Sequence, residues 1–166
     1  MFKKIDPKVL DHNVFSAIGD QWMLITAGTA EDCNTMTASW GGLGVIWGAP
    51  AATCYIRPQR YTKEFVDREE YFTLTFPGEE YRKALQLCGS RSGRDTDKIR
   101  ESGLTVETAD CGAPYIAEGE LVLVCRKRFA QPLNPDNIPQ EIKTKWYPQA
   151  DYHTLYIGEI VEVLVR

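Results

Sequence analysis

Two long apolar stretches decide the fold: ELVLVCRKRF at residues 120–129 and TLYIGEIVEVLV at residues 154–165. Both are rich in the β-branched and aliphatic residues that pack well on a pleated sheet. Their length predicts two central strands of a sheet or barrel. Shorter runs of strand length lie at residues 22–27, 36–40, 52–56, 71–76 and 104–107.

The helices predicted around these strands are few and short. A helix over 7–15 would begin at Asp6 as N-cap with Pro7 in its first position. Residues 79–88 place Tyr81, Ala84, Leu85 and Cys88 on one face, and a third helix would span 96–101. Many strands with few helices predict one domain over residues 1–166, either α+β or mostly-β, with a mostly-β barrel as the favoured arrangement.

Two irregular segments interrupt this pattern. The glycines at 41, 42, 44 and 48 predict loops or places where backbones come close. Four of the nine prolines, at 132, 135, 139 and 148, lie in the connection between the two long strands. A connection of that length is commonly functional, for example as a lid or a dimer arm.

Composition excludes several classes of protein. The 166 residues carry a net charge of −4, which argues against a general nucleic-acid or membrane-surface binder. No apolar run approaches the roughly 20 residues that cross a bilayer, and no apolar stretch follows the first lysines as in a signal peptide. The five cysteines are odd in number and lack C-x-x-C spacing, so we expect unpaired thiols in a reducing cytoplasm.

The segment from residue 34 to residue 40 is the first candidate for chemistry. Hydroxyl residues alternate with apolar ones and a tryptophan closes the run, in the order Asn34, Thr35, Met36, Thr37, Ala38, Ser39 and Trp40. An ordinary amphipathic strand would show the same alternation. A flat heteroaromatic cofactor, however, needs apolar contact on its faces and hydrogen-bond partners along its edge, and this segment offers both.

Two basic, hydroxyl-rich turns are candidates for a phosphate site. The first, RPQRYTK at 57–63, contains Arg57, Arg60, Tyr61 and Thr62, with Thr62 predicted to cap the next helix. A helix N-terminus beside arginines favours phosphate. The second, SRSGRDTDK at 90–98, contains Ser92, Gly93, Arg94 and Lys98. Solvated surface turns are the alternative reading of both segments.

Histidine is rare in this chain, so each one is informative. His153 and His12 are the only two, and His153 follows Asp151 and Tyr152 directly before the last strand. No group of His, Cys or carboxylate residues has metal-ligand spacing, so no metal site is predicted. The sequence also lacks a Gly-x-Ser-x-Gly elbow and a Gly-x-Gly-x-x-Gly turn. A structural histidine is the alternative to a functional one.

Taken together and in order, these segments resemble the flavin reductase-like family of FMN-binding split barrels, close to the flavoredoxins. The matching pieces are NTMTASW at 34–40, IRPQRYT at 56–62, SGRDTDK at 92–98 and HTLYIGEI at 153–160. The resemblance implies a split β-barrel homodimer with FMN at the subunit interface. The family's Gly-Asp-His here becomes Ala150-Asp151-Tyr152-His153, with a tyrosine inserted before the histidine.

The resemblance also assigns roles to residues. It implies that Met36 to Trp40 line the isoalloxazine and ribityl chain, and that His153 lies near a nicotinamide. It implies a phosphate region made by Arg57, Thr62, Ser92, Gly93 and Lys98, with Arg60, Tyr61 and Arg94 as helpers.

The function expected from this resemblance is an NADH- or NADPH-dependent FMN oxidoreductase, a flavin reductase. A non-enzymatic FMN electron-transfer protein that exchanges electrons with a redox protein partner is the second hypothesis. A flavin-free, ligand-binding barrel is the third. In the first two the cofactor carries out the redox chemistry, which suits a sequence without an evident acid–base dyad.

Overall fold

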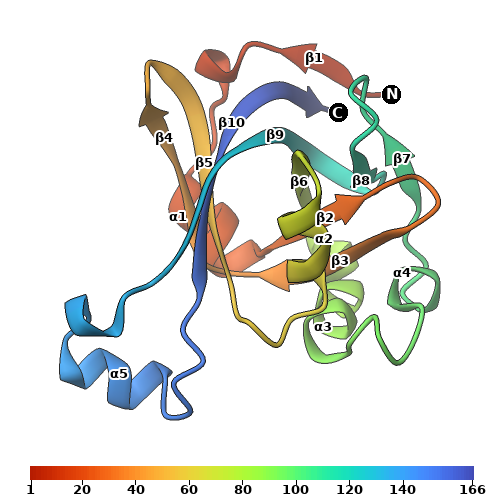
Figure 1. Ribbon diagram of the computed structural model, residues 1–166. Helices are drawn as coiled ribbons and strands as arrows, with labels where there is room; N and C mark the ends of the chain where they lie inside the picture. The colour runs from red at the N-terminus through yellow and green to blue at the C-terminus, as the bar shows by residue number, and fades with distance from the viewer.

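The two long apolar stretches form the central strands, as the sequence predicts. The computed structural model describes residues 1–166, and Figure 1 shows their arrangement. The strands are β1 (Lys3–Ile5), β2 (Met23–Gly28), β3 (Cys33–Ala38), β4 (Gly41–Ile46), β5 (Ala49–Ile56), β6 (Tyr71–Pro77), β7 (Val106–Thr108), β8 (Pro114–Ile116), β9 (Gly119–Pro132) and β10 (Thr154–Val165). The α-helices are α1 (Val14–Ser16), α2 (Thr62–Arg68), α3 (Arg82–Ser90), α4 (Lys98–Glu101) and α5 (Gln140–Trp146). The 3-10 helices are η1 (Pro7–Val9), η3 (Glu79–Tyr81) and η4 (Pro135–Asn137), and η2 (Ala17–Gln21) is a π-helix.

One antiparallel eight-stranded sheet curls into the barrel seen in Figure 1. Its order is β3-β2-β6-β9-β10-β5-β4, and β1 pairs with the last residues of β10. Register shifts after Ile157 and Ile160 interrupt the pairing of β10 with β9, and such irregularities bend a strand. No strand pair joins β3 to β4, so the barrel is split between its two end strands. The mostly-β split barrel predicted from the sequence is confirmed.

Strand β2 connects the barrel interior to the helix that covers it. Met23 and Ile25 are fully buried in the interior cluster, whereas Leu24 packs on the other side with Leu85 and Cys88 of α3. This explains why β2 is apolar throughout and not alternating, because both of its faces are covered. The apolar face predicted for the 79–88 helix is confirmed, although its first turn is η3.

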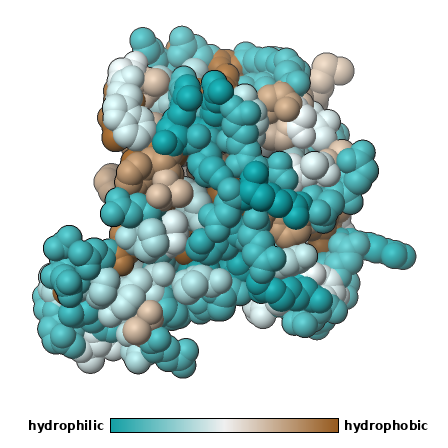
Figure 2. Space-filling model, viewed as in Figure 1, coloured by the Kyte–Doolittle hydropathy of each residue, from teal (hydrophilic) through white to brown (hydrophobic).

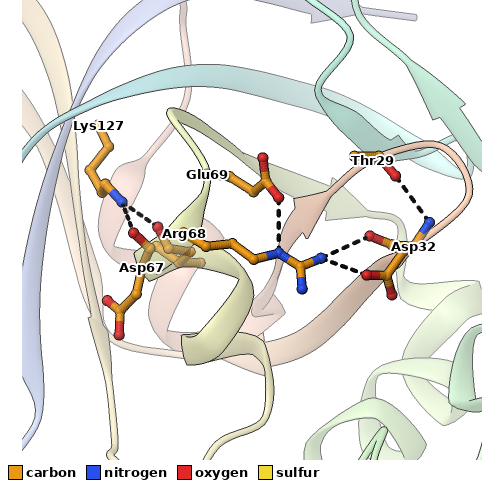
Figure 3. A network of polar contacts seen from close by, with 7 residues as sticks. Thr29, Asp32, Asp67, Arg68, Glu69 and Lys127 are labelled. Atoms are coloured by element: carbon orange, nitrogen blue, oxygen red, sulfur yellow. Dashed lines mark hydrogen bonds and ion pairs between the residues drawn. The ribbon is translucent and has the colours of Figure 1, made fainter.

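Helix α2 is held at its C-terminal end by the polar network in Figure 3. Lys127 of β9 donates hydrogen bonds to two carbonyl groups in the last turn of α2. Arg68 pairs with Asp32 in the β2–β3 turn and with its neighbour Glu69. Exposed ion pairs contribute little stability, so the network mainly fixes where α2 lies. The other end of α2 faces the candidate site.

The glycine-rich segment differs from its prediction as a loop. Residues 41–46 form strand β4, and the turn lies at Trp47 and Gly48, which both have positive φ (50° and 73°). The predicted close backbone approach does occur at Gly41, where an added Cβ would lie 2.6 Å from the Thr53 carbonyl oxygen. Pairing with β5 overrides the weak strand propensity of glycine.

The proline-rich connection contains a helix that the sequence analysis did not predict. Its middle forms α5, which projects from the barrel at the lower left of Figure 1. The N-terminal helix is also shorter than predicted, since η1 ends at Val9 and α1 begins after an Asn13 cap. The cap of η1 by Asp6 is confirmed, because its side chain accepts a hydrogen bond from the Lys8 backbone. None of the helices has the length and apolar content that a bilayer crossing requires.

Candidate functional site

A cavity of about 370 Å³ opens at the split of the barrel, where Ser39 and Trp40 join β3 to β4. We call it the Trp40 cavity. Its walls are Met36, Thr37, Ala38, Ser39, Trp40, Tyr55, Arg57, Arg60, Trp146 and His153. The sequence predicted eight of these ten and missed Tyr55 and Trp146. The adjacent aromatics at 146 and 147, in an otherwise polar connection, were the available signal.

Strand β3 is suited to hold a ligand because it is an end strand. It pairs only with β2, so the backbone groups along its other edge are available to a partner. The Thr37 hydroxyl donates to the Leu85 carbonyl of α3 and keeps that helix against the strand. Thr35 is instead fully buried, and its hydroxyl pairs with that of Thr26 at 2.9 Å. Thr35 therefore supports β3 and does not line the cavity.

Aromatic rings form the wall opposite β3. The Trp40 ring lies edge-on to Trp146, with centroids 5.1 Å apart, and 5.0 Å from the His153 ring. Arg57 forms an ion pair with Asp151 at 2.9 Å and donates to the Trp146 carbonyl at 3.0 Å. The charge of Arg57 is thus compensated, and its contacts fix the connection at this wall.

Two cations without an acidic partner lie beside this cavity, the half-buried Arg60 and the buried Lys98. Arg60 donates to the carbonyl groups of Cys88 and Gly89, at 3.2 and 2.8 Å. Lys98 is 3% exposed and donates to the carbonyl groups of Cys88 and Arg91, at 3.0 and 3.1 Å. Neither forms an ion pair. Burial and the nearby Arg60 charge lower the pKa of Lys98 to about 8.

The turn that carries Gly93 packs tightly against β3. An added Cβ at Gly93 would lie 2.1 Å from Asn34 Oδ1 and 3.0 Å from the Tyr61 ring. The Asn34 amide in turn donates to the Thr62 hydroxyl at 2.7 Å, with both side chains buried. The prediction that Thr62 caps α2 is wrong: Tyr61 holds the N-cap position without a side-chain hydrogen bond. Thr62 lies one residue inside the helix, where its hydroxyl meets Asn34.

A second cavity of about 670 Å³, the Lys98 cavity, follows the first along β3. The predicted residues Asn34, Tyr61, Gly93 and Lys98 line it, together with carboxylates such as Glu31 and Asp97. The structure therefore distributes the predicted residues over two cavities, with consecutive residues Arg60 and Tyr61 on either side.

Two further predicted residues, Ser92 and Arg94, line neither cavity. The Ser92 hydroxyl accepts the Arg94 backbone N–H at 3.2 Å. The guanidinium of Arg94 stacks on Tyr61, 4.7 Å from the ring centre, and pairs with Glu64. Arg94 thus stabilises the turn through contacts on its outer side.

His153 faces the Trp40 cavity and is 7% exposed. Its Nδ1 lies 2.7 Å from the Tyr147 hydroxyl. Burial, reinforced by the Arg57 charge, lowers the pKa of His153 to about 4. The imidazole is therefore neutral across the physiological range.

The buried charge of Lys98 predicts an unusual pH dependence of stability. The folded-state pKa of about 8 lies below the ordinary 10.5, so burial of the ammonium destabilises the fold fully below pH 8. This cost is relieved as the pH rises from 8 towards 10.5. In this interval Lys98 has lost its proton in the folded state but still holds it in the unfolded state. The free energy of unfolding of the wild type, minus that of Lys98→Met, should rise over this interval. Urea denaturation at each pH measures it, and a constant difference contradicts the assignment.

The thiols agree with the sequence analysis. All five cysteines are unpaired, and Cys54, Cys88 and Cys125 are buried. No three His, Cys, Asp or Glu side chains are grouped closely enough to hold a metal ion.

Comparison with known proteins identifies solved structures that share this fold. Solved structures with a similar fold include flavoredoxin from Methanosarcina acetivorans (TM-score 0.68, 23% identity, covering 99% of this chain and 75% of that one). Flavoredoxin of Desulfovibrio vulgaris (Miyazaki F) gives a TM-score of 0.69 and 21% identity, over 98% of this chain and 77% of that one. An FMN-binding domain of a flavin reductases-like enzyme from Shewanella baltica OS155 gives 0.69 and 17%, over 99% and 77%.

At these identities the likeness shows the fold alone. None of the curated proteins matches the chain. The flavin reductase like domain, however, matches residues 15–166, which is all of the chain except its first 14 residues. The matched region contains the split barrel and both cavities, and the chain therefore belongs to the flavin reductase-like domain family.

Proposed function

We propose that this protein binds FMN and acts as an NAD(P)H-dependent flavin reductase. The observation that supports it best is the pair of uncompensated cations, the half-buried Arg60 and the buried Lys98, beside an aromatic cavity. Positive charges withdrawn from water without a carboxylate partner are costly unless an anion neutralises them. A ligand that is flat at one end and anionic at the other satisfies both parts of the site. FMN has this shape, and the Shewanella baltica neighbour is described as FMN-binding.

The residues present fit this cofactor. Met36 to Trp40, at the open edge of β3, would contact the isoalloxazine ring and ribityl chain. Arg60, Lys98 and the close-packed turn at Gly93 would hold the phosphate, since charge-assisted hydrogen bonds are the strong ones. Arg57 lies on the ring side of the site with its charge paired to Asp151.

The residues of the chain would bind FMN, orient it and keep water away from it. When bound, FMN supplies the hydride acceptor. The Trp40 and Trp146 rings contact each other in the wall of the cavity, and His153 lies in the same wall, where a nicotinamide would approach. Because this histidine is neutral and has no carboxylate partner, we assign it no proton-transfer role.

A second candidate function is FMN-mediated electron transfer with a redox protein partner. The contact between Trp40 and Trp146 favours it, because this pair narrows the entry that a nicotinamide would use. The two flavoredoxins among the similar structures are consistent with it. A flavin-free ligand-binding barrel is the remaining alternative. The five unpaired cysteines favour action in the reducing cytoplasm.

Binding and reduction are tested on the purified protein. We expect a yellow protein that releases FMN on heating, and apoprotein that quenches FMN fluorescence on titration. Absence of quenching would exclude both flavin functions. Anaerobic NADH or NADPH should then bleach the bound flavin if the protein is a reductase. Binding without bleaching by either nucleotide selects the electron-transfer function.

We further propose that the protein is a homodimer. An apolar cleft of about 640 Å³, lined by residues that include Phe15, Leu43 and Leu133, lies on the other side of Trp40 from the cofactor cavity. Phe15 is 89% exposed, and Trp47 at the tip of the β4–β5 hairpin is 65% exposed. Apolar residues also gather along the left edge of the molecule in Figure 2. Apolar surface of this kind, continuous with a functional site, is typical of an interface. A second copy covers it without requiring a further component.

The dimer predicts a mass twice that of the 18.8 kDa chain in sedimentation velocity. Phe15→Glu should shift the protein to the monomer, because a carboxylate would have to be desolvated in the interface. Val161→Glu is the matched control, since Val161 is also exposed but lies outside this cleft. A monomeric wild type would refute the dimer.

A further inference from the structure

The imidazole of His153 has one nitrogen engaged and one free. Nδ1 lies 2.7 Å from the Tyr147 hydroxyl. Nε2 forms no hydrogen bond within the protein. Every buried side-chain nitrogen or oxygen of the chain does form one, so Nε2 is not a buried atom. Nε2 is therefore accessible, and because the residue lines the Trp40 cavity, this atom opens on the cavity.

The surroundings of Tyr147 decide which atom carries the proton. Burial raises the pKa of the Tyr147 phenol, and the Arg57 charge and the His153 backbone N–H oppose that rise. The phenol thus keeps its proton. A phenol is also a better donor than a neutral imidazole, and an imidazole nitrogen is a better acceptor than a phenol oxygen. Tyr147 consequently donates to Nδ1, which leaves the imidazole proton on Nε2.

Burial keeps the imidazole of His153 neutral, and the nearby Arg57 charge reinforces the effect. Arg57 lies 5.0 Å from the centre of the Tyr147 ring, and its positive charge opposes an imidazolium. Asp151 is the nearest acid along the chain, but Arg57 and Gln59 both bind its carboxylate. Trp40 and Tyr152 contribute only uncharged rings next to His153 and Tyr147. A tyrosine, and not a carboxylate, therefore orients this histidine.

We propose that Tyr147 is a positioning residue that fixes His153 as the neutral Nε2–H tautomer, so that the Trp40 cavity presents one fixed hydrogen-bond donor to a carbonyl group of its ligand. The identity of that ligand rests on the proposed function; the tautomer belongs to the chain alone. The carbonyl belongs either to the flavin ring or to the carboxamide of a nicotinamide. A fixed neutral donor can orient and polarise such a carbonyl without moving a proton.

The tautomer is measured by ¹⁵N NMR on the ligand-free protein. His12→Gln removes the only other histidine, so all remaining imidazole signals belong to His153. We expect a protonated Nε2 and an unprotonated Nδ1 from about pH 6 to pH 8. In Tyr147→Phe the two tautomers should interconvert and the imidazole signals should average. The proposal is overturned if Nδ1 of His153 carries the proton in the protein that retains Tyr147. An imidazole spectrum that is unchanged in Tyr147→Phe overturns it as well.

The donor role is measured by two substitutions of His153. Glutamine restores an N–H near the position of Nε2, whereas leucine removes it. We expect His153→Leu to weaken ligand binding on the order of 10-fold and His153→Gln to recover most of that loss. A fall in FMN affinity identifies the flavin carbonyl, and a raised KM for NADH at unchanged FMN affinity identifies the carboxamide.

Equal behaviour of the leucine and glutamine variants overturns the donor role. If the wild type binds no flavin, the proposed function fails, and the NMR measurement still decides the tautomer. If flavin binds but Nδ1 carries the proton, only the inference about Tyr147 fails.

Discussion

Lys98→Met is expected to weaken FMN binding by about 10- to 100-fold and, at the same time, to stabilise the ligand-free protein. The ammonium is buried between carbonyl groups, next to Arg60, with no acid to compensate it. Charge-assisted contacts contribute roughly 1.5–3 kcal/mol each, which sets the loss of affinity. Methionine fills a similar volume without a buried charge, and such replacements are often stabilising. FMN fluorescence quenching and urea denaturation measure the two effects.

The opposite signs separate this prediction from simple misfolding. Riboflavin, which lacks the phosphate, should bind both proteins equally. Lys83→Met is the matched control, because Lys83 is an exposed lysine on α3 that lines neither cavity, and this variant should bind FMN normally. A Lys98→Met protein that keeps its FMN affinity would remove Lys98 from the phosphate site.

Gly158→Val should strongly destabilise the folded barrel. A Cβ at this position would lie 2.6 Å from the Cys125 Cβ and 2.7 Å from Phe72 Cζ. Both neighbours are fully buried, Cys125 in the adjacent strand β9 and Phe72 in β6, which pairs with β9, so the added methyl groups have no space. Overpacking of this kind costs about 1–3 kcal/mol or more. Thermal or urea denaturation should show the loss.

Gly44→Val provides the control for that substitution. Gly44 is also a strand glycine, but an added Cβ meets nothing within 4 Å, and valine favours an extended backbone. This variant should be neutral or slightly stabilised. Equal destabilisation of the two variants would show that loss of backbone flexibility, and not the close contact with Phe72, is the cause.

The fold was largely predictable, because the periodic pattern of apolar residues in the sequence marks which side chains are buried. The strand over 154–165 was predicted with its observed bounds, and the face of α3 with its buried residues. Two segments were not predictable. Gly41 to Ile46 has weak strand propensity and becomes a strand through its partner β5. Helix α5 has no buried residue, so no apolar face marked it in the sequence.

The candidate site was predictable as a set of residues but not as an arrangement. Eight residues of the Trp40 cavity were predicted, from residue types in short segments and from the family resemblance. The family resemblance assigned Arg57 and Lys98 to one phosphate site, whereas the structure pairs Arg57 with Asp151 and leaves Lys98 uncompensated. Tyr147 and Trp146 were missed because their importance comes from contacts with Trp40 and His153.

The sequence by itself determined most of the strands, the apolar helix face and the segments that could carry chemistry, because these depend on local periodicity and residue type. Only the tertiary structure decided which charges are compensated, which end strand keeps a free edge and which side chain orients His153. Ion pairing, dielectric environment and hydrogen-bond partners arise between residues far apart in the chain, such as Arg57 and Asp151 or Arg60 and Cys88. The long strands therefore specify the barrel, and the way it closes specifies the chemistry at its split.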